Sequence, residues 1–402
     1  MEWNLETLSL LSIPLISALV GWLTNYLAVK MMFYPIEFVG IKPIFGWKGL
    51  IPAKRRQMAE IEVELVLGKL LSVEELAQRI DPSDLTKAIE RRLGQVTRKV
   101  VNDVMSESAP QLWAALPVQG KNLVYQRIEN DIPNVVHKMV DDFQHNVAEI
   151  LDIKELVVEQ LVNSPSLINE IFLTAGSKEF PFIVRSGFYF GFLFGLPTMI
   201  LWYFFQNWWI LPLGGLLVGY ATNWIAIKII FEPKRPVKFG PITIQGMFLK
   251  RQKEVSEVYA EIIEQKLITP KNITHVILHG SGSAQLLELI ELHVNDAIER
   301  YVAITQPYFA LGVGSENYHR MKALAVKQIF DNSDKYLLYA YDYANDALHV
   351  GQDLCERMQA LSAEEFEGVL RPAYQQDEWK LIVTGALLGL LAGFAQLYLV
   401  FL

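Results

Sequence analysis

The sequence predicts an all-α integral membrane protein with four transmembrane helices and two helical cytoplasmic domains. Three features indicate this fold. Four apolar segments are long enough to cross a bilayer, the two long segments between them are charged with a helical period, and one helix–domain–helix unit occurs twice. The tandem repeat predicts pseudo-two-fold symmetry about an axis along the membrane normal, as in transporters with parallel repeats.

Membrane helices are predicted where apolar residues continue for about 20 positions, the length that spans a bilayer. Helices in the core of a soluble protein are usually amphipathic and rarely so evenly apolar, so a soluble core explains these segments poorly. The first segment follows an acidic start and precedes no small-residue cleavage site, so we expect the mature protein to keep it. The four segments are residues 8–32, 182–204, 208–231 and 381–402.

Orientation follows from the basic residues. Gln206 and Asn207 join the second helix to the third, and aromatic residues crowd that turn as they do at a membrane–water boundary. The turn and both chain ends lack Lys and Arg, whereas basic residues follow the first and third helices. The positive-inside rule then predicts both termini outside and both soluble segments in the cytoplasm. The basic residues are Lys42, Lys48, Lys54, Arg55, Arg56, Lys234, Arg235, Lys238, Lys250, Arg251 and Lys253.

The cytoplasmic segments, residues 33–181 and 232–380, are predicted to be helical throughout. Apolar positions in residues 54–71 recur with a helical period, and Pro82 with Asp84 in the first turn is a good helix start. Strand patterns with a period of two are absent. The glycine-rich stretch HGSGSA is expected to separate two helices.

The repeated unit returns after 198 positions, so that Gly21 corresponds to Gly219. After one deletion, residues 60–71 match residues 257–268 at a spacing of 197. Both matched stretches end at a helix-start signal, Ser72 with Glu75 and Thr269 with Pro270. The other residues matched at 198 are Thr24 with Thr222, Asn25 with Asn223, Lys30 with Lys228, Gly187 with Gly385, Gly191 with Gly389 and Gly195 with Gly393.

The Thr-Asn pairs lie on a face of small residues in the first and third membrane helices. Small residues at every fourth position let helices approach closely in lipid, and an asparagine among them can hydrogen-bond a facing helix. The glycine triplets of the second and fourth helices are the expected partners. Two interpretations stay open for Thr24, Asn25, Thr222 and Asn223: helix packing, which we favour, or a polar site within the membrane.

Lys30 and Lys228 point away from that face and lie near the ends of their helices. We expect their ammonium groups to extend to the inner headgroups. Binding of an anionic lipid headgroup or an anionic substrate is the alternative.

Composition excludes several classes of function. The net charge of −8 disfavours a nucleic-acid partner, and the single Cys355 excludes an intramolecular disulfide. Phosphate-loop, zinc-protease and nucleophile-elbow motifs are absent, so we expect no catalytic residue and no cofactor. His275 and His279 have a metal-ligand spacing but no third ligand, so we expect no metal site.

The doubled motif G-x-x-T-N-x-x-A-x-K-x-x-F-x-P, followed by GLIPAKRR at residues 49–56, resembles the bacterial membrane family catalogued as domain of unknown function 445, or UPF0754. LSAEEFEGVLR before the last helix is also similar to it. The resemblance implies an integral protein of the inner membrane and supplies no activity. The second unit has GMFLKRQK without the proline of the first, which leaves room for a different loop shape there.

Two functions fit these features. The first is a non-enzymatic scaffold whose helical domains bind membrane lipids, with anionic headgroups of the inner leaflet as candidates, or a protein partner. The second is a small repeat-symmetric transporter or channel, which with four helices per chain would need a homodimer. Large charged helical segments beside basic loops favour the first, and the duplicated polar motif at membrane depth favours the second.

Overall fold

The computed structural model describes residues 5–41, 45–312, 314–371, 375 and 377–401, and they form two compact units. Unit 1 comprises residues 1–66, 158–262 and 354–402, and unit 2 comprises residues 67–157 and 263–353. Residues from both segments expected to be soluble, 33–181 and 232–380, occur in each unit.

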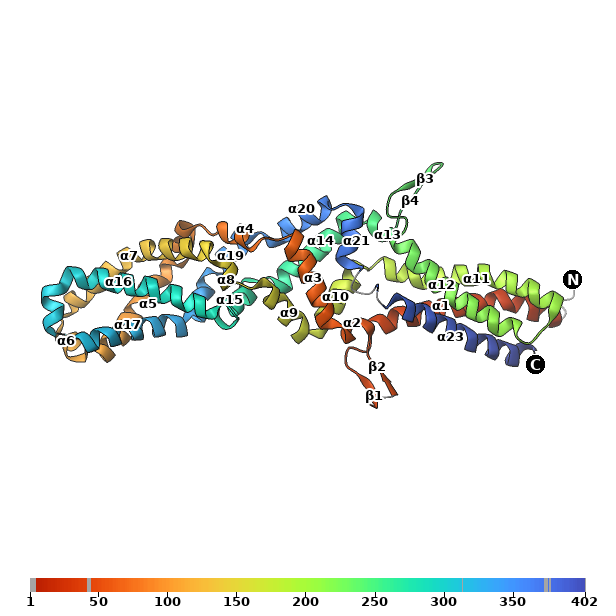
Figure 1. The fold of residues 1–402 in the computed structure, drawn as a ribbon, viewed down its shortest axis with the longest axis horizontal. Coiled ribbons are helices and arrows are strands. Elements are labelled where there is room, and N and C mark those ends of the chain that lie inside the picture. Colours follow the sequence, from red (N-terminus) through yellow and green to blue (C-terminus); the bar gives the residue numbers. More distant parts are fainter. Residues whose placement is uncertain (1–4, 42–44, 313, 372–374, 376, 402) are drawn as a thin grey trace. The chain divides into compact units, whose positions relative to one another are not determined.

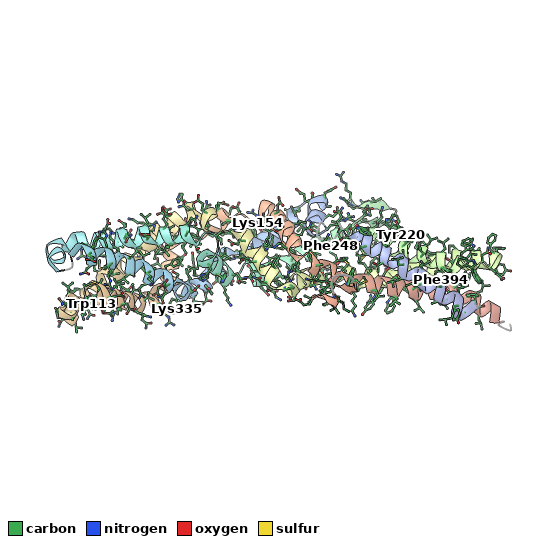
Figure 2. The ribbon with its side chains drawn as sticks, turned by 60° about the horizontal axis from the view of Figure 1, so that its bottom comes forward. Trp113, Lys154, Tyr220, Phe248, Lys335 and Phe394 are labelled. Atoms are coloured by element: carbon green, nitrogen blue, oxygen red, sulfur yellow. The ribbon has the colours of Figure 1, made fainter. Side chains whose placement is uncertain are left out.

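Four long helices of unit 1 lie side by side as a bundle (Figure 1). They are α1 (Leu5–Phe33), α11 (Glu179–Phe205), α12 (Ile210–Phe231) and α23 (Glu378–Gln396), which continues as the π-helical turn η3 (Leu397–Phe401). Their apolar spans, residues 8–33, 179–205, 210–231 and 378–401, are long and apolar enough to cross a membrane. Large apolar side chains such as Tyr220 and Phe394 lie exposed on the bundle surface, where lipid would cover them (Figure 2).

The turn between α11 and α12 starts at Gln206, whose φ of 45° is left-handed and ends the helix. Five aromatic side chains around it are about half exposed or more, as expected where rings meet headgroups. Trp202 is buried instead, because its ring packs against Phe401 with centroids 4.7 Å apart. The exposed rings are Tyr203, Phe204, Phe205, Trp208 and Trp209.

Two short β-hairpins follow α1 and α12, so the expectation of helix throughout the soluble segments is wrong there. Strands β1 (Val39–Ile41) and β2 (Phe45–Trp47) pair antiparallel, as do β3 (Val237–Phe239) and β4 (Ile242–Ile244). Strands of three residues are too short to show a period of two, which explains why the sequence pattern missed them. One hydrogen bond closes the base of each hairpin, from Gly49 to Pro35 at 2.9 Å and from Gly246 to Pro233 at 3.0 Å.

The turns after the hairpins have the same shape, which corrects the expected difference between GLIPAKRR and GMFLKRQK. Gly49 before α2 (Leu50–Ala53) has φ −50° and ψ 143°, and Gly246 before α13 (Met247–Lys250) has φ −47° and ψ 131°. Pro52 fits because the first turn of a helix does not use its backbone N–H groups. A Cβ on either glycine would lie within 2.8 Å of the preceding membrane helix, so both turns need glycine.

The remaining helices of unit 1 are short and pack beside the membrane bundle. The short helix after each hairpin packs against a helix later in the chain: α2 packs against α10, and α13 packs against α21. Helix α10 also packs against α14. The helices are α3 (Arg55–Lys69), α9 (Ile153–Asn163), α10 (Pro165–Ala175), α14 (Gln252–Ile262), α20 (Val350–Ala360) and α21 (Ala363–Leu370); α3, α9 and α20 run into unit 2.

Unit 2 is built on four long amphipathic helices, α5 (Pro82–Ser108), α7 (Val118–His145), α16 (Ser283–Gly312) and α17 (Gly314–Asp331). Helix α5 starts as expected, with Asp81 accepting hydrogen bonds from Ser83 and Asp84, and α15 starts at Thr269 and Pro270. HGSGSA does separate α15 from α16. The others are α4 (Val73–Gln78), α6 (Pro110–Ala115), α8 (Val147–Ile150), η1 (Ile263–Leu267), α15 (Pro270–His279), α18 (Ser333–Leu337), η2 (Leu338–Ala340) and α19 (Tyr341–Leu348).

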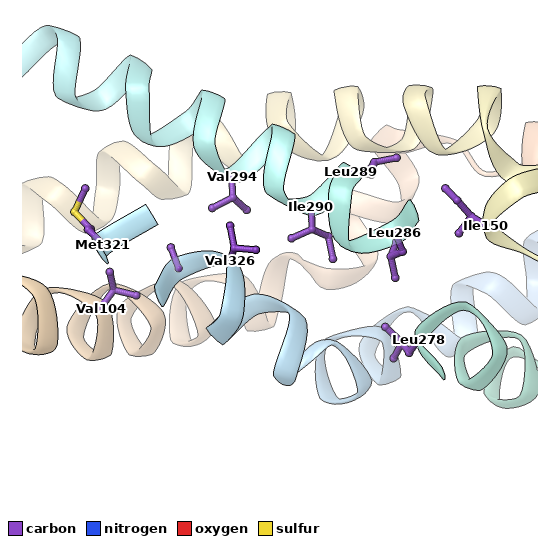
Figure 3. Close-up of a cluster of buried hydrophobic side chains, with 10 residues drawn as sticks. Val104, Ile150, Leu278, Leu286, Leu289, Ile290, Val294, Met321 and Val326 are labelled. Atoms are coloured by element: carbon purple, nitrogen blue, oxygen red, sulfur yellow. The ribbon is translucent and has the colours of Figure 1, made fainter. Parts of the chain in front are cut away.

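The core of unit 2 joins residues from both halves of the sequence (Figure 3). Val104 of α5 and Ile150 of α8 lie in one cluster with side chains of α15, α16 and α17. Figure 3 shows Ile290 and Val294 of α16 above Val326 of α17. Burial of these apolar side chains holds helices together that are about 200 residues apart in the chain.

Candidate functional site in the membrane helices

Asn25 holds α1 against α11. Its side chain is fully buried, and its Nδ2 donates a hydrogen bond of 2.7 Å to the carbonyl oxygen of Ile183. Thr24, 2% exposed, donates to the carbonyl of Gly21 in its own helix at 3.1 Å. Because lipid offers no hydrogen-bond partner, the bond from Asn25 to the neighbouring helix favours association of α1 with α11.

Asn223 makes the matching contact between α12 and α23. Its Nδ2 donates to the carbonyl oxygen of Leu381 at 2.8 Å, and the residue is 3% exposed. Thr222 donates to Gly219 in its own helix at 3.4 Å. Each asparagine therefore reaches a carbonyl 158 positions further along the chain.

The Oδ1 atom of Asn25 differs, because it is buried and has no hydrogen-bond partner among the described residues. Buried side-chain oxygens are usually paired with protein or with ordered water. This atom is the one feature of the motif that helix packing leaves unexplained.

The glycines let backbones touch at these contacts. A Cβ on Gly21 would collide with the carbonyl oxygen of Gly187, and one on Gly219 would collide with that of Gly385. Such approach is the usual reason for small residues at helix interfaces in lipid. The other triplet members make similar contacts: Gly191 meets Ser17, Gly195 meets Pro14, Gly389 meets Gly215 and Gly393 meets Leu211.

The structure does not bring the lysines to the asparagines. Lys30 and Lys228 are exposed, whereas the asparagines are buried. The ammonium group of Lys30 lies 5.8 Å from the centre of the Tyr26 ring, and that of Lys228 lies 4.8 Å from the centre of the Trp224 ring. Lys228 also lies 3.3 Å from Glu232. Each ammonium group is therefore held over an aromatic ring on the outside of the bundle.

Two ion pairs with buried acidic side chains lie at the same end of the bundle as the lysines, and sequence reasoning missed them. Arg251 lies 2.6 Å from Glu179 at the start of α11, and Lys54 lies 2.9 Å from Asp377 just before α23. The acidic side chains are only 2% and 5% exposed. Burial opposes ionisation of Asp377, but hydrogen bonds from Lys380 and Lys54 outweigh it and hold its pKa below the usual range.

A signal for these pairs is present in the sequence. Glu179 and Asp377 lie 198 positions apart, and Lys54 and Arg251 lie 197 apart, the two spacings of the matched stretches. Charges of one sign therefore recur at matching positions. Their pairing was hidden because each base meets the acid of the other half of the chain.

A small apolar cavity lies beside these pairs. Its volume is about 50 Å³, enough for a few water molecules, and the ends of α1, α11, α12 and α23 surround it. Two carboxyl-bearing residues, Glu179 and Glu378, share its wall with apolar side chains that include Met32, Ile183, Ile230 and Leu381.

The rings of His275 and His279 are tilted to each other with centroids 5.1 Å apart, and His279 lies 3.6 Å from Asp334. Across the described residues no group of three or more His, Cys, Asp or Glu is arranged to hold a metal ion.

Part of the chain is similar to membrane proteins of unknown function. Residues 15–119 match the family described as protein of unknown function DUF445. The chain is similar to UPF0754 membrane proteins of Rippkaea orientalis (24% identical, covering 37% of this chain and 40% of the relative) and Thermosynechococcus vestitus (30% identical, 26% and 30%). A UPF0754 membrane protein of Exiguobacterium sibiricum is 27% identical over 32% of this chain and 35% of its own length. No solved structure matches.

The resemblance to DUF445 and UPF0754 is thereby confirmed, and with four apolar helices it makes this chain a multi-pass membrane protein. The alignments span 30–40% of the length of these relatives.

Proposed function

Starting from a multi-pass membrane protein with a DUF445 segment, we propose a non-enzymatic membrane scaffold that binds lipid or a protein partner where its soluble helices meet the bilayer. The observation that carries this proposal is which contacts the residues of the two Thr-Asn motifs make. Their amides hold helices together, and the lysines of the same motifs are exposed outside the bundle.

The scaffold is built from two copies of one unit. Support comes from the contacts of matched residues: the asparagine bonds, the glycine approaches and the hairpin bases all recur at spacings of 197 or 198. The second copy has one residue fewer between its two hairpin strands. Ile41 and Phe45 flank residues 42–44, whereas Phe239 and Ile242 flank only residues 240–241. We expect pseudo-two-fold symmetry along the membrane normal.

Exchanged ion pairs support one joined assembly of the copies. Arg251 of the second copy meets Glu179 of the first, and Lys54 of the first meets Asp377 of the second. Pairs of this kind hold the copies in one arrangement, because separation would leave buried charges without partners.

Anionic lipid is the binding partner that the lysines favour. Lys30 and Lys228 lie within the last turn of their membrane helices, at headgroup depth, with the ring beneath each limiting its motion. With the positive-inside rule, these groups and both units' soluble helices face the cytoplasm, and both termini lie outside.

Native mass spectrometry tests the proposal. Wild-type protein should retain phosphatidylglycerol in preference to phosphatidylcholine, and the double variant Lys30→Gln/Lys228→Gln should lose most of that preference. Lys121→Gln is the matched control, because Lys121 is a half-buried lysine of unit 2 whose ammonium group also lies over an aromatic ring, that of Trp113. Equal retention of both lipids by wild type and the double variant would contradict lipid binding at the motif.

A transporter or channel is the second candidate, and the unpaired Oδ1 of Asn25 favours it. The cavity at the ends of the four helices has a volume of about 50 Å³, too small for a solute path, so we expect a path to form between two copies of the chain. Cross-linking in lipid tests whether the chain forms a dimer, and a liposome assay tests whether it carries solute. A monomer that shows no solute flux would exclude a transporter or channel.

A further inference from the structure

We infer that the two β-hairpins are lipid anchors, which lie in the interfacial layer of the membrane on the side where the soluble helices emerge. The inference deepens the proposed lipid-binding role and rests on it for the identity of that side. The hairpins would form a second lipid-binding surface, separate from Lys30 and Lys228.

The position of the hairpins is the first argument. α1 ends at Phe33 and α12 at Phe231, and each hairpin base closes within a few residues, at Pro35 and Pro233. Both hairpins project sideways from the end of the membrane bundle, on opposite sides of it (Figure 1). A segment that leaves a membrane helix sideways at its end stays at the depth of the headgroups.

The exposed faces are the second argument. Val39 and Ile41 are two positions apart in β1, so their side chains lie on the same face of the first hairpin, and they are 63% and 78% exposed. Val237 and Ile244 are directly paired across the second hairpin and are 52% and 50% exposed. β-Branched apolar side chains this exposed in both hairpins form an apolar surface that no described part of the protein covers.

Charge decides what covers that surface. On the second hairpin, Lys238 pairs with Thr243 in the register, so they occupy the face opposite Val237. Lys238 is exposed, and Arg235 near the base, which lies 3.3 Å from Glu364, has a side chain that is 87% exposed. An apolar face with basic residues behind it matches acyl chains below anionic headgroups. A protein partner would have to match the same apolar face twice, on opposite sides of the bundle.

Fluorescence in nanodiscs tests the insertion. In a Cys355→Ser background, single cysteines at Ile41, Ile244 and Val118 carry an environment-sensitive dye. Val118 is the control, since it lies in unit 2 and is 72% exposed. We expect the hairpin dyes to be quenched by spin-labelled acyl chains and shielded from iodide, with the reverse at Val118. The inference would be overturned if iodide quenched the hairpin dyes as strongly as the dye at Val118. It would also be overturned if the dyes showed energy transfer between the hairpins of two copies and no quenching by lipid.

The charge is tested at Ile244 with a spin label carried on phosphatidylglycerol or on phosphatidylcholine. Quenching should favour phosphatidylglycerol, and Lys238→Gln should reduce that preference by about fivefold, the effect of one charge near an anionic surface. If quenching shows no preference for phosphatidylglycerol with either Lys238 or Gln at this position, the hairpin does not bind anionic headgroups. Retention of lipid by Lys30 and Lys228 is measured separately, so the two proposals can fail independently.

Discussion

Arg251 and Glu179 form a buried ion pair, with nitrogen and oxygen 2.6 Å apart across a sequence separation of 72 residues. Arg251 also lies 2.8 Å from Glu254, so its charge has two acidic partners, whereas among the described residues the ion-pair partner of Glu179 is Arg251. The two sides of the pair should therefore respond differently to mutation.

Arg251→Gln should destabilise the protein by about 3–5 kcal/mol, because it leaves Glu179 buried without its charge partner. Glu179→Gln should cost less, because Arg251 keeps Glu254. Thermal unfolding in detergent measures both. Arg56→Gln is the control, since Arg56 and Glu60 lie 3.9 Å apart on the surface, and it should change stability by less than about 0.5 kcal/mol. Equal losses for Arg251→Gln and Glu179→Gln would contradict this asymmetry.

Stability should fall in acid through Glu254. Hydrogen bonds from Arg251 and Lys178 lower the pKa of Glu254 to about 2 from 4.5. A carboxyl with a lowered folded pKa stabilises the fold above its unfolded pKa, and the contribution is lost as pH falls towards the folded value. Melting temperature should therefore drop between about pH 4.5 and pH 2, less steeply in Glu254→Gln. Lys178→Gln, which removes one of the two donors, should be intermediate, and identical slopes in the three proteins would refute the assignment.

Glycine contacts can be tested with a single methyl group. Gly191→Ala and Gly389→Ala place a Cβ against the backbone oxygens of Ser17 and Gly215, so the helices must separate. We expect a loss of about 1–3 kcal/mol, and more for leucine. Gly368→Ala is the matched control, because a Cβ on this helical glycine meets nothing within 4 Å and should stabilise by up to about 1 kcal/mol. Normal melting of Gly191→Leu would show that this contact does not hold the bundle.

The membrane helices and their contacts were accessible from the sequence because both depend on local patterns. Apolar length marks the helices, and small residues at every fourth position mark the faces on which Asn25 and Gly187 meet. Residues matched at a spacing of 198, such as Asn25 with Asn223, make matching contacts in the structure.

The hairpins and the ion pairs were not accessible, for two different reasons. Strands of three residues such as β1 carry no periodic signal. The pair of Lys54 with Asp377 joins positions 323 apart (377 − 54), and a spacing of that size says nothing about contact. The core of unit 2 has the same property, because it combines Val104 with Val326.

Orientation is tested by labelling intact cells. A cysteine at Asn207, in the turn between α11 and α12, should react with a membrane-impermeant maleimide, because the positive-inside rule places this turn outside. A cysteine at Ser281 in unit 2 should react only after the cells are opened. Both variants carry Cys355→Ser, which removes the single native thiol. Labelling of Ser281 with protection of Asn207 would invert the topology.

Asn25→Ala and Asn223→Ala separate helix packing from a binding site. Each variant removes one hydrogen bond to a backbone carbonyl, of 2.7 Å and 2.8 Å, within the bundle. If packing is the role, each should destabilise by about 0.5–1.5 kcal/mol, the range for such bonds in membranes. Lipid content in the folded fraction should then stay as in wild type. The Oδ1 of Asn25 is buried without a hydrogen-bond partner among the described residues, so a site there would show as normal melting with loss of a bound molecule in Asn25→Ala. Thr24→Val is the control, because its hydroxyl bonds only within α1 at 3.1 Å and its loss should leave the contact with α11 intact.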